Sequence, residues 1–252
     1  MLPTERRKQI QKIISAEKNI SIPELMERLQ ISRSTLYRDL QHLKKDSLIS
    51  AEDAQTIPVP PNYEEQQEIV QTAVQMICEI DSIFLGEGLL CLLLAKKIRE
   101  QNRLKNITVV TNNFNAALEL VSHIAHVYLL GGNLLQNVKS YYTGGPRMEN
   151  NLSTIFVSKA FASVDGVDIQ SGYTMHELSQ LGILTHLPDF SAQTIFLIPS
   201  DCFGFYSIHQ LAPLNFADKI ITDHNLPESL QKSFSSMSKP ELILPSSPTC
   251  GS

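Results

Sequence analysis

A run of polar and basic side chains after Ser32 has the chemistry of a surface that reads DNA. Arginine can donate hydrogen bonds to guanine or phosphate, and hydroxyl groups suit phosphate oxygens or the thymine methyl group. Ser32 is a preferred helix N-cap, so a helix should begin directly after it. Its outward-facing residues would be Arg33, Ser34, Thr35, Tyr37, Arg38 and Gln41. The pattern predicts a recognition helix that lies in the major groove.

Two further helices must position this one. Ser21 and Glu24 match a capping box, which predicts that a second helix begins there. A first helix over about residues 4–16 would direct its basic side chains outward, namely Arg6, Arg7, Lys8 and Lys12. The three helices would share an apolar centre made of Ile10, Ile13, Ile14, Leu25, Leu29, Leu36, Leu40 and Leu43. Together they predict a small winged helix-turn-helix unit whose DNA-binding residues include Ser21 and Ser32.

The charge is distributed unevenly along the chain. Residues 1–50 contain ten Lys or Arg and six Asp or Glu, whereas the other 202 residues contain eleven and twenty. A basic module on an acidic body is expected when only one end of a protein meets phosphates. The alternative for residues 1–50 is a solvated amphipathic helical hairpin with no role in DNA binding.

The composition also predicts the domain boundaries. Prolines 58, 60 and 61 fall in a segment that disfavours helix and favours a semi-rigid connector. We therefore predict a DNA-binding domain over 1–53, a Pro-rich linker over 54–63, an α/β domain for effector sensing and oligomerisation over 64–245, and a tail over 246–252.

Short apolar runs alternate with helical patterns in the larger domain. Helices are predicted over 64–80, 90–99 and 116–121, and strands over 83–85, 107–111, 127–130, 154–157, 162–164, 194–198, 219–222 and 241–244. This alternation is typical of an α/β fold with a mostly parallel sheet covered on both faces. A ligand site would then lie at the carboxyl ends of the strands.

Other chemistries find little support in the sequence. Gly86-Glu87-Gly88 could form a phosphate loop between a strand and a helix, but the third glycine of a dinucleotide fingerprint is missing. The four cysteines lie far apart, His123 and His126 have no accompanying ligands, and no nucleophile signature occurs. We expect no cofactor, no metal and no catalytic residues. With no apolar run of membrane-spanning length, a cytoplasmic protein is expected.

The segments Glu5–Ile10, Ile20–Leu25 and Ile31–Leu40 resemble the DeoR family of bacterial transcription regulators. The resemblance continues along almost the whole chain. It implies an N-terminal DNA-binding domain and a C-terminal sensor, similar to ribose-phosphate isomerases, that usually binds a phosphorylated sugar. Tyr37 replaces the first of two consecutive arginines common in the family. The acidic wing around Glu52 and Asp53 replaces a basic one, which predicts modest DNA affinity or a need for oligomeric binding.

The resemblance also implies an effector site, with Lys159 in a retained Lys-Ala-Phe segment and Asp165 in a retained Asp-Gly segment. Where the family carries Asp-Ser-Gly-Thr-Thr, this chain has Gly86-Glu87-Gly88-Leu89-Leu90, and two lysines of the family are absent, at Leu184 and in 199–204. Losing cations and hydroxyl donors while gaining Glu87 and Asp201 reverses the local field. The predicted effector residues are Gly86, Glu87, Gly88, Asn112, Gly131, Gly132, Lys159 and Asp165.

These observations predict a sequence-specific DNA-binding transcription regulator of DeoR type, a repressor, that acts as a dimer or tetramer on double-stranded DNA. Its effector would be uncharged or cationic and sugar-like rather than phosphorylated. The pocket could instead be vestigial, with the retained residues only shaping turns. Two alternatives remain open, namely a sugar-phosphate isomerase-like enzyme and a ligand-independent DNA-binding protein.

Overall fold

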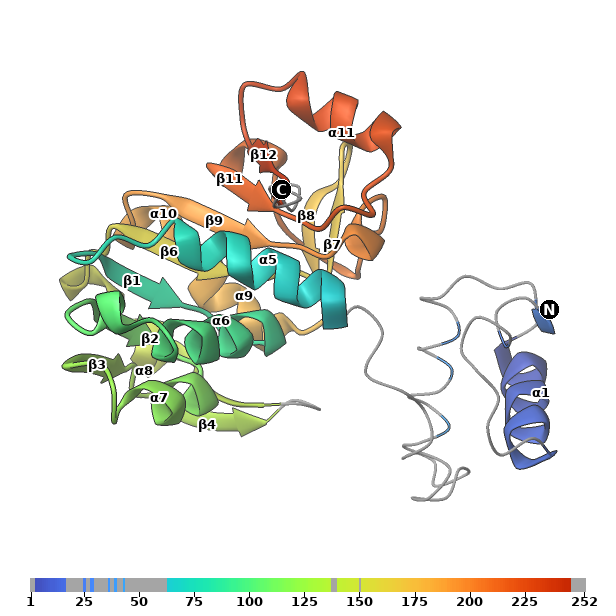
Figure 1. The fold of residues 1–252 in the computed structure, drawn as a ribbon, viewed down its shortest axis with the longest axis horizontal. Coiled ribbons are helices and arrows are strands. Elements are labelled where there is room, and N and C mark those ends of the chain that lie inside the picture. Colours follow the sequence, from blue (N-terminus) through green and yellow to red (C-terminus); the bar gives the residue numbers. More distant parts are fainter. Residues whose placement is uncertain are drawn as a thin grey trace, which may run out of the picture. The chain divides into compact units, whose positions relative to one another are not determined.

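The computed structural model describes residues 3–16, 63–136, 140–149 and 151–245, together with the single positions 25, 28, 29, 36, 39 and 43 (Figure 1). The chain divides into two compact units, Met1–Tyr63 and Glu64–Ser252.

The N-terminal unit contains helix α1 (Pro3–Ala16), as the sequence predicted. Ile10 and Ile14 are buried, and the helical residues Leu25, Leu29, Leu36 and Leu43 are buried as well. Ile13 is only half-buried. The apolar spacing thus identified most of this small core, while Leu40 lies outside the described residues.

Two arginines of α1 depart from the prediction that they face solvent. Arg6 Nε and Arg7 Nε both donate to the carboxylate of Asp39, the second over 2.9 Å. Asp39 is fully buried, so a charge at this position needs such partners. Arg6 and Arg7 therefore connect α1 to the segment that carries Leu36 and Asp39, instead of being free for phosphate.

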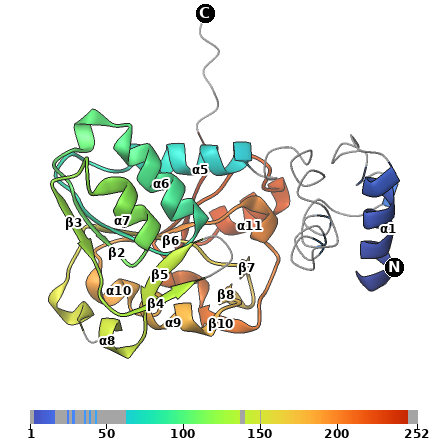
Figure 2. The same ribbon diagram turned by 90° about the horizontal axis from the view of Figure 1, so that it is seen from below.

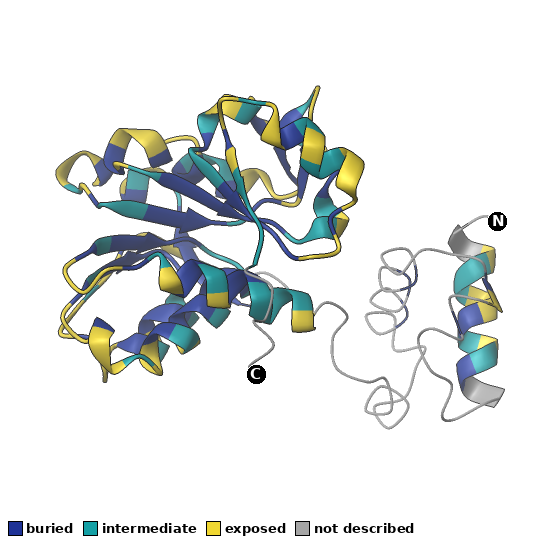
Figure 3. Ribbon diagram, turned by 45° about the horizontal axis from the view of Figure 1, so that its top comes forward, coloured by how far each residue is buried: buried dark blue, intermediate teal, exposed yellow. Residues whose placement is uncertain are grey.

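Seven parallel strands form the central sheet of the larger unit, in the order β12-β11-β9-β6-β1-β2-β3. The strands are short and apolar, which suits a sheet buried on both faces. Figure 3 shows the inner strands as deeply buried, whereas β3 and β12, at the two ends of the order, are more exposed. Their bounds are β1 (Ser82–Leu85), β2 (Thr108–Thr111), β3 (His126–Leu129), β6 (Lys159–Ala162), β9 (Thr194–Leu197), β11 (Lys219–Ile221) and β12 (Glu241–Ile243).

Helices cover one face of this sheet, namely α5 (Tyr63–Gln75), α6 (Leu89–Arg99) and α7 (Phe114–Leu120). Alternate strand residues point to opposite faces, so Ile83 and Leu85 pack with these helices. Figures 1 and 2 show the three helices on the same side of the strands.

The other face receives Phe84 and is covered by smaller elements. A three-stranded antiparallel sheet in the order β10-β8-β7 packs there with three helices. Neither this sheet nor these helices were predicted. The bounds are β7 (Gly166–Asp168), β8 (Gly172–Met175), β10 (His209–Ala212), α9 (Leu178–Leu184), α10 (Leu187–Phe190) and α11 (Glu228–Ser235).

The remaining elements include a hairpin of β4 (Asn133–Gln136) and β5 (Tyr141–Gly144), and α8 (Pro146–Glu149). Four short 3-10 helices complete the fold: η1 (Asn102–Leu104), η2 (Leu152–Thr154), η3 (Ser200–Cys202) and η4 (Leu214–Phe216).

Two strand predictions were wrong. The run 154–157 is not a strand, because η2 ends in it, Phe156 is 68% exposed, and only Val157 forms an isolated bridge, to Ser191. The strand predicted over 162–164 begins earlier, at Lys159, so β6 places Ala160 and Phe161 on opposite faces of the sheet. The apolar runs indicated a strand in this region of the sequence, but not the residue at which it begins to pair with its neighbours.

Candidate effector site

All seven strands are parallel, so the loops that follow them gather at one edge of the sheet, here called the carboxyl edge. The strand order reverses direction at β1 and β6, because β2 and β3 follow on one side of β1 while β9, β11 and β12 follow on the other. Ligands of open α/β sheets bind beside such a reversal, outside the carboxyl ends of the strands. The loops after β1 and β6 therefore define the candidate site.

The loop after β1 is held in shape by its neighbours. The Gly86 amide donates to Phe161 O of β6 over 2.8 Å. Asn113 donates from Nδ2 to Gly88 O over 3.2 Å and caps α7 through Oδ1, which accepts from Ala116 N over 3.0 Å. Gly88 has a φ of 102°, which favours glycine. Asn113 was not among the predicted site residues, although an asparagine just before a helical pattern is an N-cap signal.

Glu87 of this loop forms a polar corner with the hairpin and with α9. Its Oε1 accepts a hydrogen bond from Nε2 of the buried Gln180, and Tyr142 Oη lies 2.9 Å from Ser179 Oγ. Burial raises the pKa of Tyr142, and the charges of Glu87 and Glu177 raise it further, so both carboxylates lie close to this phenol. We call Glu87, Tyr142, Ser179 and Gln180 the Glu87 corner.

The thiol of Cys91, one helical turn into α6, lies near the same carboxylate. Burial raises the pKa of Cys91 to about 12, and the negative charge of Glu87 adds to the effect. This thiol donates to Phe161 O over 3.5 Å. The environment of Cys91 is therefore that of an inert buried thiol.

Asn112 joins the end of β2 to the hairpin. Its Nδ2 donates to Thr143 O over 3.2 Å, and Thr143 N donates to Asn112 O over 2.8 Å. The residue is 1% exposed, yet among the described residues its Oδ1 has no hydrogen-bond partner. A buried acceptor without a donor is costly. Asn112 thus has a structural role and also keeps one acceptor for a ligand or water.

The two glycines after β3 differ in what they require. A Cβ on Gly132 would lie 2.7 Å from Gly144 O, so a side chain there would collide with the hairpin. A Cβ on Gly131 would meet nothing within 4 Å. Of the two predicted effector residues, Gly132 is needed for packing, whereas Gly131 is exposed and unconstrained by neighbours.

A second group of carboxylates follows β6, β9 and β11. The Cys202 thiol donates to Asp201 Oδ1 over 3.6 Å, and its pKa is raised by burial and by the charges of Asp201, Asp165 and Asp223. Asp165 accepts from His176 N over 2.7 Å. Asp223 is buried and accepts from Ser200 N over 2.7 Å. This part of the carboxyl edge is acidic.

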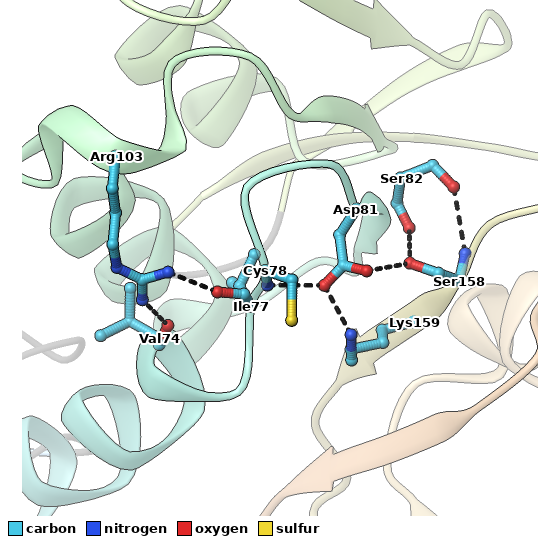
Figure 4. A network of polar contacts seen from close by, with 8 residues as sticks. All are labelled: Val74, Ile77, Cys78, Asp81, Ser82, Arg103, Ser158 and Lys159. Carbon is cyan, nitrogen blue, oxygen red and sulfur yellow. Dashed lines mark hydrogen bonds and ion pairs between the residues drawn. The ribbon is translucent and has the colours of Figure 1, made fainter.

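Lys159 does not lie with the other predicted effector residues. It opens β6, so it lies at the opposite, amino edge, where its Nζ is 2.5 Å from Asp81 Oδ2 (Figure 4). Asp81 also accepts from Cys78 N over 2.8 Å and from Ser158 Oγ over 2.9 Å. Lys159 was predicted as an effector residue because it lies in the retained Lys-Ala-Phe segment. The structure does not bring it to the candidate site, since a residue that begins a parallel strand lies at the opposite edge of the sheet.

Two other cations lie away from the carboxyl edge. Lys219 is the first residue of β11. Arg103 donates to Ile77 O over 2.6 Å and to Val74 O over 2.9 Å near the end of α5 (Figure 4). Leu184, which replaces a family lysine, is buried in the core. Arg147 is exposed on α8, beside β5. Carboxylates of four strand-end loops thus occupy the carboxyl edge, while Lys159 and Lys219 lie across the sheet.

The predicted DNA-binding residues lie outside the described residues. They are Ser21, Ser32, Arg33, Ser34, Thr35, Tyr37, Arg38 and Gln41.

Comparison with known protein families identifies both units. A family model described as the DeoR C-terminal sensor domain matches residues 61–224, and a helix-turn-helix domain model matches residues 6–53. The chain belongs to the DeoR family. DeoR proteins are transcription regulators, and the helix-turn-helix match implies DNA binding.

Several named relatives are similar in sequence to this chain over most of their length. A regulator of Bacillus subtilis, named YulB, is 27% identical over 240 residues, which cover 90% of this chain and 91% of YulB. The regulator GlpR of Haloferax volcanii is 26% identical, covering 90% and 92%. The lactose phosphotransferase system repressor of Streptococcus mutans is 28% identical, covering 92% and 96%.

The fold also has partial matches among solved structures. The ribose 5-phosphate isomerase of Methanocaldococcus jannaschii is 12% identical, with a TM-score of 0.41, over 56% of this DeoR chain and 55% of that one.

In the part of the chain that the structure describes, no helix is long and apolar enough to cross a membrane, and no three metal-ligating side chains cluster.

Proposed function

We propose that this DeoR protein is a transcriptional repressor whose sensor domain binds an uncharged or cationic sugar-like effector instead of a sugar phosphate. The observation that supports this most directly is the carboxylate of Glu87 in the loop after β1, beside the strand-order reversal. In sensors of this family that position is expected to hold donors for a phosphate.

The electrostatics of the carboxyl edge argue against a phosphorylated effector. A phosphate monoester carries up to two negative charges and is held by cations, amides and hydroxyls. Glu87, Asp165 and Asp201 would repel it, and Lys159 cannot reach it from the amino edge. The free acceptor on Asn112 calls for a donor, which a sugar hydroxyl or an amine would supply, and the charge of Glu87 favours such a group over a phosphate.

Helix α5 and the linker connect the sensor domain to the DNA-binding domain. Helix α5 is the first described element after the linker, and its first turns lie at the carboxyl edge. There Asn225 Nδ2 donates to Glu65 Oε1 over 2.9 Å, and His224 Nδ1 lies 2.6 Å from Glu68 Oε2. His224 and Asn225 directly follow Asp223. The carboxylate of Asp223 accepts hydrogen bonds from Asn225 N and from Ser200 N, which lies in the loop after β9. A ligand that moves these loops would therefore shift α5 and the linker with it.

An isomerase-like enzyme is the main alternative. Such an enzyme would have to hold a sugar phosphate at the same carboxyl edge, so the same charges argue against it. A ligand-independent DNA-binding protein is the second alternative. Regulation through DNA, with no turnover of sugar phosphates, is the function that the family and the charges support together.

The test is a thermal-shift titration of the full chain with matched sugars, amino sugars and sugar phosphates. Saturable stabilisation by a neutral or amino sugar, with none by the phosphates, is the expected result. Stabilisation by a phosphate alone would contradict the proposal, and turnover of that phosphate would establish the enzyme. If no compound in a broad panel stabilises the protein, the ligand-independent alternative replaces it.

Repression is tested separately with DNA fragments selected from the genome by the purified protein. Bound fragments placed before a reporter should give lower expression with the protein than without it, and the stabilising sugar should relieve the effect. Higher expression in the presence of the protein would instead identify an activator.

A further inference from the structure

Exposed apolar side chains gather on the flank of the larger unit that ends in β3. Leu118 and Val121 come from α7 and its end, Tyr128 and Leu129 from β3, and Leu134 and Tyr141 from the β4–β5 hairpin. Their exposed fractions run from 40% for Leu129 to 63% for Val121. In Figures 1 and 2, α7, β3 and the hairpin lie side by side. We call these six residues the β3 flank.

Contacts connect the three elements. Asn115 Oδ1 of α7 accepts from Tyr141 N over 2.8 Å, and Leu118 is three residues further along the same side of the helix. Leu134 and Tyr141 share a face of the hairpin, since Gln136 pairs with Tyr141 and Leu134 lies two positions from Gln136. Helix α7 contacts both β3 and the hairpin, and Tyr128 and Leu129 point to opposite faces of β3, so the β3 flank surrounds one edge of the sheet.

The strand at its centre has an open edge. Strand β3 pairs with β2 on one side and is last in the order of described strands. Leu130 N donates to Thr111 O, so by alternation the amides and carbonyls of Val127 and Leu129 face away from β2. Natural edge strands are protected by lysine, proline or a bulge. The four residues of β3, His126–Leu129, include no lysine or proline.

The charge of this segment favours a copy of itself. From residue 118 to residue 141 the sequence contains two charged residues, Glu119 and Lys139, and Glu119 forms an ion pair with Arg99, so the flank carries little net charge. An uncharged surface does not repel an identical copy, and a two-fold axis places a strand antiparallel to itself. Backbone groups at an open edge are matched best by another strand. The surface is therefore self-complementary in hydrophobicity, hydrogen bonding and charge.

We propose that a second copy of this chain docks on the β3 flank, with the two β3 strands paired antiparallel about a two-fold axis. The central sheet then continues from one copy into the other, and the apolar side chains of α7 and the hairpin pack across the axis. The interface is argued independently of the proposed function. Only its use depends on that function, because helix-turn-helix units bind paired half-sites. It leaves the carboxyl edge of each copy open to a ligand.

The first test measures self-association of the full chain by sedimentation velocity, without DNA or sugar. The double variant Leu129→Lys/Leu134→Lys should weaken dimerisation at least tenfold, because it introduces like charges that face each other. Ile80→Lys is the matched control, since Ile80 is 93% exposed and precedes β1 at the amino edge. The control should dimerise like the unmodified chain. An unchanged dimer in the double variant, or a monomer in the unmodified chain, would overturn the proposal.

A second test does not depend on the folding of the lysine variants. In a background with Cys78→Ser and Cys250→Ser, single cysteines are placed at positions 126 to 129. Antiparallel pairing about a two-fold axis leaves one residue opposite its own copy, with Cβ atoms about 5 Å apart. One position should therefore crosslink under mild oxidation, and Ile80→Cys should not. Equal crosslinking at all positions, or none at any, would contradict the paired strands. Because neither test uses DNA or effector, failure here leaves the proposed function intact.

Discussion

Glu68 of α5 and His224 of the loop after β11 are in direct contact, although 155 residues separate them in the sequence. The Nδ1 of His224 lies 2.6 Å from Glu68 Oε2, and the His224 amide is 3.3 Å from the same oxygen. The contact joins the helix next to the linker to a loop at the carboxyl edge. It offers a place where effector binding and DNA binding can be separated by substitution.

Glu68→Ala should uncouple the two events. We expect effector affinity to change less than twofold, since Glu68 lies on α5, outside the loops that follow β1 and β6. The effect of the effector on DNA affinity should fall several-fold. Fluorescence anisotropy with labelled DNA, with and without saturating effector, measures it. Glu64→Ala, at an exposed position one turn earlier, is the control and should respond normally. Full coupling in Glu68→Ala would refute a route through this contact.

Glu87→Gln should change which ligands the sensor accepts. The variant keeps an acceptor for Gln180 but removes a negative charge, which relieves about 1 kcal/mol of repulsion toward a phosphate near a solvated site. Phosphorylated sugars should bind about fivefold more tightly, and cationic ones more weakly. Calorimetric titration of matched sugar and sugar-phosphate pairs tests this. Glu149→Gln on α8 serves as the control, and an equal gain there would mean that Glu87 has no special position.

Lys159→Met should weaken the fold without changing the ligand. Asp81 is nearly buried, and removing its cationic partner should cost roughly 2 kcal/mol of unfolding free energy. Urea unfolding at neutral pH measures the loss. Lys219→Met removes a partner of the exposed Glu241 and should cost less than about 1 kcal/mol. A change in effector affinity that exceeds the loss of folded protein would place Lys159 back in the site.

The same cluster predicts an acid dependence. Burial by itself would raise the pKa of Asp81, but hydrogen bonds from Lys159, Cys78 N and Ser158 outweigh it and hold the pKa below its ordinary value. The stabilisation is therefore complete above the unfolded pKa of about 3.9 and is lost as pH falls through the lower folded value. Unfolding free energies from pH 6 downward should fall less steeply in Lys159→Met than in the unmodified chain. Parallel curves would show that the cluster does not contribute.

Asp39→Asn should destabilise the N-terminal unit. Burial opposes the charge of Asp39, but the two arginines outweigh it and lower its pKa, so the charged form stabilises the fold above about pH 4. Losing this pairing at a fully buried position should cost about 2–3 kcal/mol. Limited proteolysis should cut the unit faster in the variant, while Glu5→Gln, an exposed change on α1, should leave the rate unchanged.

The sequence predicted the parallel sheet because its strands are buried on both faces. Runs such as 83–85, 107–111 and 194–198 contain little except apolar and β-branched residues, which is typical of short strands buried on both faces. The strands β7, β8 and β10 were missed, since Gly166–Asp168 and Gly172–Met175 carry glycine and polar residues that also suit turns. Their pairing depends on distant partners, which a local pattern does not contain.

The effector residues were predicted unevenly for a related reason. Asn112, Asp165 and Lys159 were predicted from segments that resemble the family, and such segments do not say at which end of a strand a residue lies. Asn112 and Asp165 follow β2 and β6, whereas Lys159 begins β6 and lies at the amino edge. Asn113 and Gln180 were missed since their partners, Gly88 and Glu87, lie far from them in the sequence.

The cluster around Asp81 has a consequence for the family's history. Its hydrogen bonds connect the first residues of β1 and β6 at the amino edge, across the sheet from the candidate site. Residues at the other edge can then be exchanged by single substitutions without loosening the strands that carry them. A lineage could trade hydroxyls and lysines for carboxylates one at a time, keep a folded regulator at every step, and acquire a new inducer along the way.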